Sequence, residues 1–419
     1  MKNLLLFAFF AFNCFSFAQN TLVPGKPETA GLSPERLARI DKEMQEYISK
    51  GQLPGIVALI ARNGKIVYEK SFGFSDIENK TALKTDHIFR IASQSKAVTA
   101  LAIMMLWEEG KFLLDDPLSN YIPEFKSPKV LVAFNEKDST YTAEPAKSEI
   151  TIRQLLTHSA GIDYAAIGTK EGKSIYFKAG VPSGIGTNGG VLGDKMKILG
   201  KLPLKNQPGE KWLYGLNSDV LGYLVEVFSG LTFDEFLRQR IFKPLGMNDT
   251  YFYLPKDKQP RLVKLYETKN DKLVRVAGKI YDNVDPDYPN TNGTYFSGGA
   301  GLSSTVEDYA KFLQLFLNKG EYNGVRLLSR KTVELMMTSQ LQSPITERVG
   351  LGFGLETEDI DYKSPVSLGT FNWGGAFNSH YWADPKEKLI GIVFTNVYSS
   401  PYWAISQRYR VLVYQSISD

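Results

Sequence analysis

Residues 87–100 read HIFRIASQSKAVTA. Here an extended segment, residues 87–92, gives way to an apolar helix, and Ser93 stands three positions before Lys96 at the junction. Because residues three apart project from the same face of a helix, the Lys96 amine can reach the Ser93 hydroxyl. The stretch therefore predicts a boundary between a strand-rich and a helix-rich region, and a nucleophile with its own base at that boundary.

Both ends of the chain combine a helix with a strand hairpin. Near the N-terminus, Ser33 and Pro34 form a cap and first turn, and apolar residues recur at helical spacing as far as Gly51. Asn63-Gly64 then joins two strands as a two-residue hairpin turn, because this dipeptide tolerates positive backbone angles. A second hairpin and a closing helix lie near the C-terminus. The expected elements are helices 34–50 and 402–417 and strands 56–61, 65–70, 378–383 and 389–395.

The long middle section has few strand signals and several Gly- and Pro-rich loops. Its expected helices are 96–109, 152–157, 219–228 and 233–242. Bringing both chain ends together gives an α+β fold, an α/β sandwich with one antiparallel sheet flanked by helices and an inserted, mostly helical subdomain. We expect a single domain over residues 19–419, with a sheet subdomain at about 31–90 and 291–419 and a helical subdomain at about 91–290.

The first eighteen residues have the layout of a secretory signal. Lys2 precedes an apolar run, and Ser16-Phe17-Ala18 ends the segment with a cleavage-like pattern. We therefore expect cleavage near Ala18 and an exported protein, periplasmic or secreted. The residues before Cys14 do not fit a lipid-attachment site, so no stable membrane anchor is expected.

The composition is that of an ordinary globular protein. The 419 residues are 43% hydrophobic and 22% charged. The formal net charge of +4 is small for this length and no basic cluster is interleaved with aromatics, so nucleic-acid binding has little support. Loss of Cys14, the only cysteine, leaves no disulfide or thiolate metal site. We expect no metal and no cofactor, a small-molecule partner, and an oligomeric state that the sequence leaves open.

The spacing of Ser93 and Lys96 has two interpretations. The serine could simply cap the helix, and such a spacing occurs by chance in many chains. A capping design would place Glu or Gln at the fourth position, whereas Lys96 puts a cation at the positive end of the helix dipole. The chain has no Gly-x-Ser-x-Gly or His-Glu-x-x-His motif. His87, His158 and His380 are expected to be structural, so Lys96 is the remaining base.

Two further parts of such a site have candidates in the sequence. Tyr214, in an apolar segment just before a helix, could relay a proton between serine and lysine, or it could be a half-buried aromatic. An oxyanion hole needs two backbone N–H groups, and Ser93 at its helix start supplies one. The glycines of residues 373–376, WGGA, would leave a strand edge open for the other. The alternative for that segment is a simple turn into the hairpin.

Seven segments occur in order along the chain: HIFRIASQSKAVTA at 87–100, GKFLLDDPLSNYIPEF at 110–125, ITIRQLLTHSAGI at 150–162, PGEKWLYGLNSDVLGYLVE at 208–226, IFKPLGMNDT at 241–250, FSGGAGLSSTVEDYAKF at 296–312 and FNWGGAF at 371–377. Together they resemble the serine β-lactamase and penicillin-binding-protein superfamily. The resemblance is to its class C β-lactamase-like branch, which includes the family VIII carboxylesterases. It runs from about residue 37 to residue 394.

The resemblance implies a role for each candidate residue. Ser93 would be the acylated nucleophile and Lys96 its base. Tyr214 would be the tyrosine of the second family motif. The backbone N–H groups of Ser93 and Ala376 would form the oxyanion hole.

The chain departs from the β-lactamase pattern at two motifs. Trp373, Gly374 and Gly375 stand where those enzymes usually have Lys-Thr-Gly, whose cation meets the drug's carboxylate. The second motif is usually Tyr-x-Asn, but here Asn217 comes one place late after Tyr214. We expect Trp373, Gly374, Gly375 and Asn217 to contact substrate, and both departures resemble the esterase branch.

The sequence therefore predicts an exported serine hydrolase that forms an acyl-enzyme at Ser93 and acts as a carboxylesterase on small esters. One alternative is a β-lactamase or a D-amino-acid-specific peptidase or carboxypeptidase, in which the same chemistry acts on an amide. An alternative of another class is a non-catalytic protein that binds cell-wall fragments. Such a protein would be expected to lack a catalytic residue.

Overall fold

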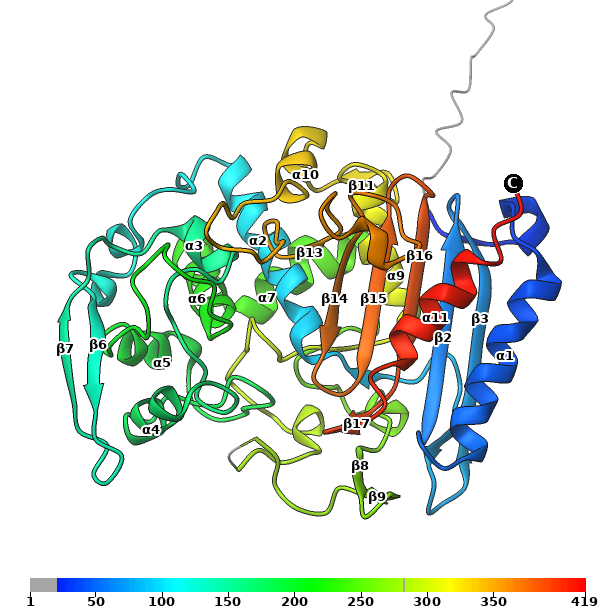
Figure 1. Cartoon of the computed structure of the whole chain (residues 1–419), viewed down its shortest axis with the longest axis horizontal. Helices are drawn as coiled ribbons and strands as arrows, with labels where there is room; N and C mark the ends of the chain where they lie inside the picture. The colour runs from blue at the N-terminus through cyan, green and yellow to red at the C-terminus, as the bar shows by residue number, and fades with distance from the viewer. Residues whose placement is uncertain (1–20, 282) are drawn as a thin grey trace, which may run out of the picture.

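The computed structural model describes residues 21–281 and 283–419. The expected signal segment, with Cys14 and the cleavage position near Ala18, lies outside these described residues. The main sheet has eight strands in the order β1-β3-β2-β16-β15-β14-β13, with β4 paired to β3. Because β16 pairs with β2, the two ends of the chain meet within the sheet (Figure 1). The strands are β1 Val23–Pro24, β2 Gly55–Arg62, β3 Lys65–Asp76, β4 Thr81–Ala82, β13 Gly354–Leu355, β14 Phe371–Gly375, β15 Ser379–Asp384 and β16 Leu389–Phe394.

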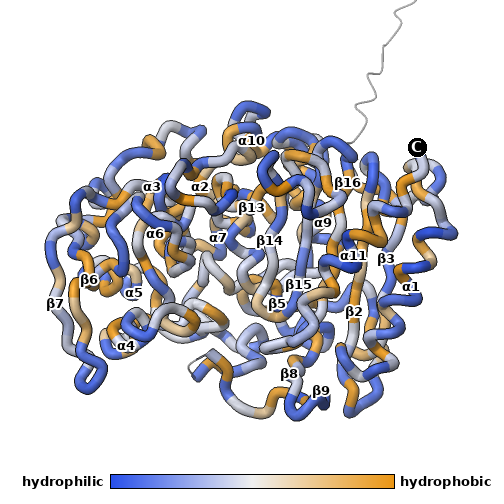
Figure 2. The backbone as a smooth tube through the Cα atoms, viewed as in Figure 1, coloured by the Kyte–Doolittle hydropathy of each residue, from blue (hydrophilic) through white to orange (hydrophobic). Residues whose placement is uncertain are grey.

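The sheet confirms both expected hairpins and is antiparallel except for the short parallel pair β1 and β3. Asn63 and Gly64 have φ angles of 54° and 75°, as a two-residue hairpin turn requires. Every residue of β2 and of β16 is buried. Burial on both faces explains why these strands are continuous apolar runs rather than alternating ones. Figure 2 shows this apolar band along β2 and a hydrophilic tip on the β6–β7 hairpin.

Helices cover both faces of the sheet. α1 (Pro34–Ser49) and α11 (Ile405–Tyr414) lie on one face, and α9 (Val306–Leu317) lies on the other (Figure 1). The expected cap of α1 is confirmed, because the Ser33 side chain accepts the Arg36 N–H at 3.3 Å. The closing helix is shorter at both ends than the expected 402–417, since turns precede Ile405 and follow Tyr414.

The middle region is mostly helical, as expected, and α2 (Ser95–Glu108) runs between it and the sheet (Figure 1). α2 packs against α6, and twelve of its fourteen residues are buried. It is therefore a central helix that lies in the hydrophobic core between the sheet and the middle region. The helices of this region are α3 Ile152–Leu156, α4 Lys170–Lys178, α5 Leu192–Leu199, α6 Asn217–Ser229, α7 Phe233–Leu237 and α8 Lys243–Leu245.

The middle region also contains two hairpins that the sequence did not predict. β6 (Lys129–Phe134) pairs with β7 (Tyr141–Pro145), and β8 (Tyr266–Lys269) pairs with β9 (Lys272–Arg275). β7 and β9 are short and have no buried residue, so they lack the apolar alternation by which a half-buried strand is recognised. β8 also pairs with β17 (Val397–Tyr398), which ties the C-terminal part of the chain to the middle region. No helix among residues 21–281 and 283–419 is long and apolar enough to cross a membrane.

Candidate active site

Ser93 lies in a tight turn between β5 (Phe89–Arg90) and α2. The preceding residue, Ala92, has a φ of 44°, a left-handed conformation that is uncommon for a residue with a side chain. No side chain caps the start of α2. The Ser93 Oγ lies instead 3.2 Å from the Lys96 Nζ. The geometry therefore favours the interpretation of Ser93 as a nucleophile over that of a helix cap.

The Lys96 amine has three polar neighbours in a closed environment. Its Nζ lies 3.2 Å from the Ser93 Oγ, 3.0 Å from the Tyr164 hydroxyl and 2.7 Å from the carbonyl oxygen of Gly299. The carbonyl can only accept, so it fixes one N–H of the amine. An uncharged amine can give its second N–H to Tyr164 and point its lone pair at the Ser93 hydroxyl. This arrangement allows Lys96 to take the serine proton.

Tyr164 is a site residue that the sequence analysis missed. Burial, and then the neighbouring Tyr214 and Asp219, raise the pKa of the Tyr164 phenol well above its usual value. The hydroxyl therefore stays protonated and can act as a hydrogen-bond donor or acceptor. Tyr164 lies two residues beyond the segment ITIRQLLTHSAGI, and no local pattern distinguishes it from the other tyrosines of the chain.

Tyr214 contacts Lys96 through its ring. The Lys96 Nζ lies 4.5 Å from the centre of the Tyr214 ring, which itself stacks on Trp212 at 5.8 Å. Within residues 21–281 and 283–419, no hydrogen bond to the Tyr214 hydroxyl is found. An aromatic face attracts a cation, so this ring would stabilise the ammonium that forms when Lys96 is protonated. The relay role of the Tyr214 hydroxyl stays a prediction.

Gly215 brings the two tyrosine-bearing loops together. A Cβ at Gly215 would lie 1.9 Å from the carbonyl oxygen of Ile162, a distance that no side chain can occupy. Only glycine allows this approach of two backbones. As a result the rings of Tyr164 and Tyr214 lie 5.4 Å apart, with their centres 5.6 and 4.5 Å from the Lys96 Nζ.

Asp219, on α6, acts on the Lys96 amine indirectly, through Gly299. The sequence analysis missed this residue as well. Its carboxylate accepts the Gly299 N–H and the Ser297 hydroxyl at 2.8 Å each, and the Tyr295 hydroxyl at 2.9 Å. Burial raises the pKa of Asp219, while these hydrogen bonds and the charge of Lys96 oppose the rise. Asp219 therefore fixes the peptide of Gly299, whose carbonyl binds the Lys96 amine.

Asn217 and His158 lie deeper than a substrate contact requires. Asn217 is fully buried, and its amide nitrogen donates to the His158 Nδ1 at 2.9 Å. Burial and the charge of Lys96 lower the pKa of His158 well below its usual value, so the imidazole is neutral. His158 packs against the Tyr214 ring at 4.8 Å. The pair supports the aromatic wall, and the expected contact of Asn217 with substrate stays a prediction.

The end of β14 lies against the turn that carries Ser93. A Cβ at Gly375 would come within 2.4 Å of the Ile91 carbonyl oxygen, so glycine is required for this contact. Ala376 follows directly, and within the described parts of the chain its N–H has no backbone partner. The N–H groups of Ser93 and Ala376 are thus the candidate donors of the oxyanion hole.

Trp373 closes the other side of the site. Its ring lies 6.0 Å from that of Tyr214, and it lines a small cavity behind Lys96 together with His158. That cavity, of about 10 Å³, is too small for a substrate. Gly374 lies between Trp373 and Gly375 and is partly exposed. In residues 21–281 and 283–419, no cluster of His, Cys, Asp and Glu side chains could hold a metal ion.

A family profile described as beta-lactamase matches residues 40–415, which is most of the chain. The chain belongs to the beta-lactamase family. Esterase EstB of Burkholderia gladioli is 28% identical over 374 residues, which cover 86% of this chain and 90% of EstB. A putative D-alanyl-D-alanine carboxypeptidase of Escherichia coli K12 is 26% identical over 434 residues, covering 96% and 92% of the two chains.

Solved structures share the fold of this chain. EstCE1, described as a hydrolase with promiscuous acyltransferase activity, superposes with a TM-score of 0.79 at 25% identity and covers 91% of this chain and 99% of its own. Together, these relatives and the family match make the protein a serine hydrolase of the beta-lactamase family with esterase-like relatives. The expected α+β fold and the resemblance to this superfamily are confirmed.

Proposed function

We propose that this serine hydrolase is a carboxylesterase that acts on small esters through an acyl-enzyme at Ser93. The observation that carries the proposal is the Lys96 amine, 3.2 Å from the Ser93 hydroxyl and almost wholly buried among aromatic rings. The amine is therefore within reach of the serine proton, as a base for nucleophilic attack must be. The substrate would be a small molecule, and no cofactor takes part.

In acylation, the Ser93 hydroxyl gives its proton to the Lys96 amine as Oγ bonds to the ester carbonyl carbon. The carbonyl oxygen becomes an oxyanion, which the N–H groups of Ser93 and Ala376 would stabilise. When the intermediate collapses, the bond from carbon to the alcohol oxygen breaks. The departing alkoxide takes the proton from the Lys96 ammonium, with the Tyr214 hydroxyl as the relay that the resemblance assigns.

Deacylation repeats these steps with water. The same amine removes a proton from a water molecule, whose oxygen bonds to the acyl carbon. The Ser93 Oγ then leaves and recovers its proton from Lys96. The products are one alcohol and one carboxylic acid, and the enzyme returns to its starting state.

Trp373 supports an ester over a β-lactam as substrate. The third-motif position carries an indole, which has no charge to meet a carboxylate. The aromatic rings of Trp373, Tyr214 and Trp212 instead form an apolar wall that suits an uncharged ester. Similarity to EstB and EstCE1 points the same way.

Two alternatives make different predictions. A β-lactamase or D-amino-acid-specific peptidase has support from the similarity to the Escherichia coli protein described as a putative D-alanyl-D-alanine carboxypeptidase. A non-catalytic protein that binds cell-wall fragments would need an impaired site. The contact of Ser93 with Lys96 argues against impairment.

One set of measurements separates these functions. We expect faster turnover of a short-chain nitrophenyl ester than of a chromogenic cephalosporin or a D-alanyl dipeptide, and a mass adduct at Ser93 with a fluorophosphonate probe. The Ser93→Ala variant should fold normally, judged by its unfolding temperature, but lose both the turnover and the adduct. Faster cephalosporin cleavage would support the β-lactamase, and absence of labelling would support the binding protein.

We also propose that the protein is exported and is periplasmic or secreted. The support is the apolar segment after Lys2 and the Ser16-Phe17-Ala18 pattern. N-terminal sequencing of protein from the exported fraction should give a chain that begins near Gln19. Full-length chain found only inside the cell would refute export.

A further inference from the structure

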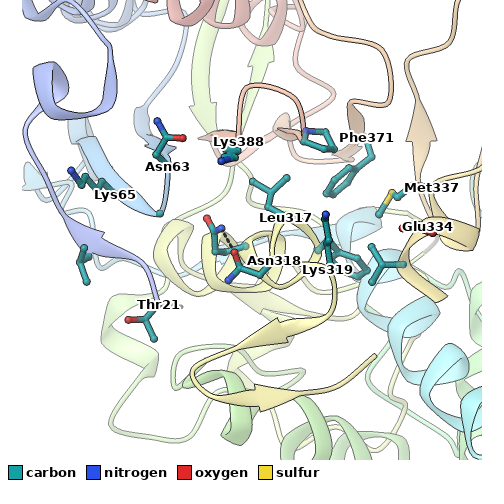
Figure 3. Close-up of a pocket in the computed structure, with 16 residues that line it drawn as sticks. Thr21, Asn63, Lys65, Leu317, Asn318, Lys319, Glu334, Met337, Phe371 and Lys388 are labelled. Atoms are coloured by element: carbon teal, nitrogen blue, oxygen red, sulfur yellow. Dashed lines mark hydrogen bonds between the residues drawn. The ribbon is translucent and has the colours of Figure 1, made fainter. Parts of the chain in front are cut away.

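A second, larger cavity lies away from Ser93, at the opposite end of β14. It has a volume of about 690 Å³, which is within the range of small-ligand sites. The start of β14, the hairpin turns next to it and the C-terminal end of α9 surround it (Figure 3). It contains none of the residues assigned to the acyl chemistry. Any ligand here would therefore be distinct from the ester in the active site.

Part of the lining of this cavity is apolar. Phe371 and Phe316 pack edge to face at 5.9 Å, and Leu317, Val333 and Met337 continue the same surface. Removing the apolar surface of a ligand from water against such residues is favourable. The cavity is thus suited to a ligand with an apolar group.

The lining also carries a surplus of positive charge. Lys65, Lys319 and Lys388 all line the cavity, and Figure 3 shows Lys388 and Lys319 around Leu317. None of the three lysines has an ion pair with a carboxylate in residues 21–281 and 283–419. Glu334, the acidic residue of the lining, is already paired with Arg330 and Lys331. Residues 1–20 contain no Asp or Glu, so the chain before Thr21 supplies no carboxylate either. We therefore expect these lysines to attract an anion from outside the chain.

Gln314 adds a second, more specific requirement. Its side chain is only 6% exposed, and its amide nitrogen donates to the Asn318 Oδ1 at 2.8 Å, the bond drawn in Figure 3. The amide oxygen, Oε1, has no hydrogen-bond partner in the described parts of the chain. A buried acceptor without a partner is costly, so a ligand that brings an N–H here would gain affinity.

We propose that this cavity binds a small ligand in which a free carboxylate stands next to a secondary amide and an apolar group. The lysines would meet the carboxylate, the Gln314 Oε1 would accept the amide N–H, and the aromatic part of the lining would take the apolar group. N-acyl amino acids and the carboxyl ends of short apolar peptides share this chemistry. The proposal does not depend on the esterase activity.

The test is calorimetric titration of the full chain carrying Ser93→Ala, so that no probe is hydrolysed. N-decanoylglycine, kept below its micelle concentration, should bind saturably. Decanoate, which lacks the amide, and N-decanoylglycinamide, which lacks the charge, should each bind at least tenfold more weakly. N-acetyl-leucyl-leucine tests the peptide source, and whichever of the two full ligands binds more tightly identifies the source. Absence of saturable binding by both would overturn the proposal.

Variants of the lining separate the two requirements. Lys319→Glu with Lys388→Glu should weaken N-decanoylglycine at least tenfold, whereas Lys126→Glu with Lys256→Glu, two exposed lysines outside the cavity, should not. Gln314→Leu should bind N-decanoylglycine no better than decanoate. Equal binding by wild-type, cavity and control variants would refute the site. Since all titrations use Ser93→Ala, their failure leaves the acyl chemistry untouched, and loss of esterase activity leaves this site untouched.

Discussion

The most direct test of the site is Tyr164→Phe, because it removes one hydroxyl and leaves the ring in place. The lost contact is the 3.0 Å hydrogen bond between the Tyr164 hydroxyl and the Lys96 Nζ, in a buried position. A hydrogen bond to a charged partner contributes about 1.5–3 kcal/mol. If that contact is made while Lys96 carries the serine proton, its loss lowers kcat/KM by about 10- to 150-fold. The ammonium formed in acylation would keep its other contacts, so activity should fall but persist.

The assay is kcat/KM for a short-chain nitrophenyl ester, with the rate of acyl-adduct formation followed by intact mass. Tyr176→Phe is the matched control. The Tyr176 hydroxyl is also buried and accepts the Asp163 N–H at 3.2 Å in the same loop, but it does not contact Lys96. The control should stay within about twofold of the wild-type rate. Near-normal activity of Tyr164→Phe, or an equal loss in both variants, would refute the assignment of Tyr164 to the site.

Three further predictions concern other parts of the molecule. Tyr214→Phe keeps the ring beside Lys96 but removes the relay hydroxyl, so acylation should slow strongly; a normal acylation rate would limit Tyr214 to its ring contact. Gly375→Ala places a Cβ 2.4 Å from the Ile91 carbonyl oxygen, so it should displace β14 from the oxyanion hole and lower kcat by at least tenfold, as steady-state kinetics would reveal. Burial lowers the pKa of His380 to about 4 from 6.5. When the pH is lowered, the unfolded chain therefore binds this proton before the folded one does, and the free energy of unfolding should fall between about pH 6.5 and pH 4. Unfolding temperatures of His380→Gln across this range should fall less steeply than those of the wild type, and equal slopes would contradict the assignment.

The elements that the sequence predicted well are those whose causes lie within a few residues. Ser33 caps α1 through the N–H of Arg36, three positions away, and Asn63-Gly64 forms its turn alone. The pairing of Ser93 with Lys96 is local in the same sense, because helix geometry sets it. Such features can be inferred from one sequence without knowledge of the rest of the fold.

The remaining site residues depend on contacts between distant segments. Tyr164 lies 68 positions from Lys96, and Gly299 lies 203 positions away, yet all three meet at one amine. The sequence analysis expected Asp219 only as the first residue of a helix. In the structure its carboxylate accepts the N–H of Gly299, whose carbonyl binds the Lys96 amine. Neither periodicity nor spacing in the sequence predicts these contacts, because they form only when α2 packs between the sheet and the middle region.

The placement of the chain's last helix has a practical consequence. α11 packs on the face of the sheet away from α9, and Asp419 is tied to Arg62 by a 2.9 Å ion pair. Ser93 lies on the α9 side, because the Tyr309 hydroxyl of α9 donates to the Gln94 carbonyl oxygen next to it. A fluorescent reporter or a resin linker attached after Asp419 would therefore lie on the face of the sheet away from Ser93. An immobilised enzyme of this kind should keep the kinetics of the free one.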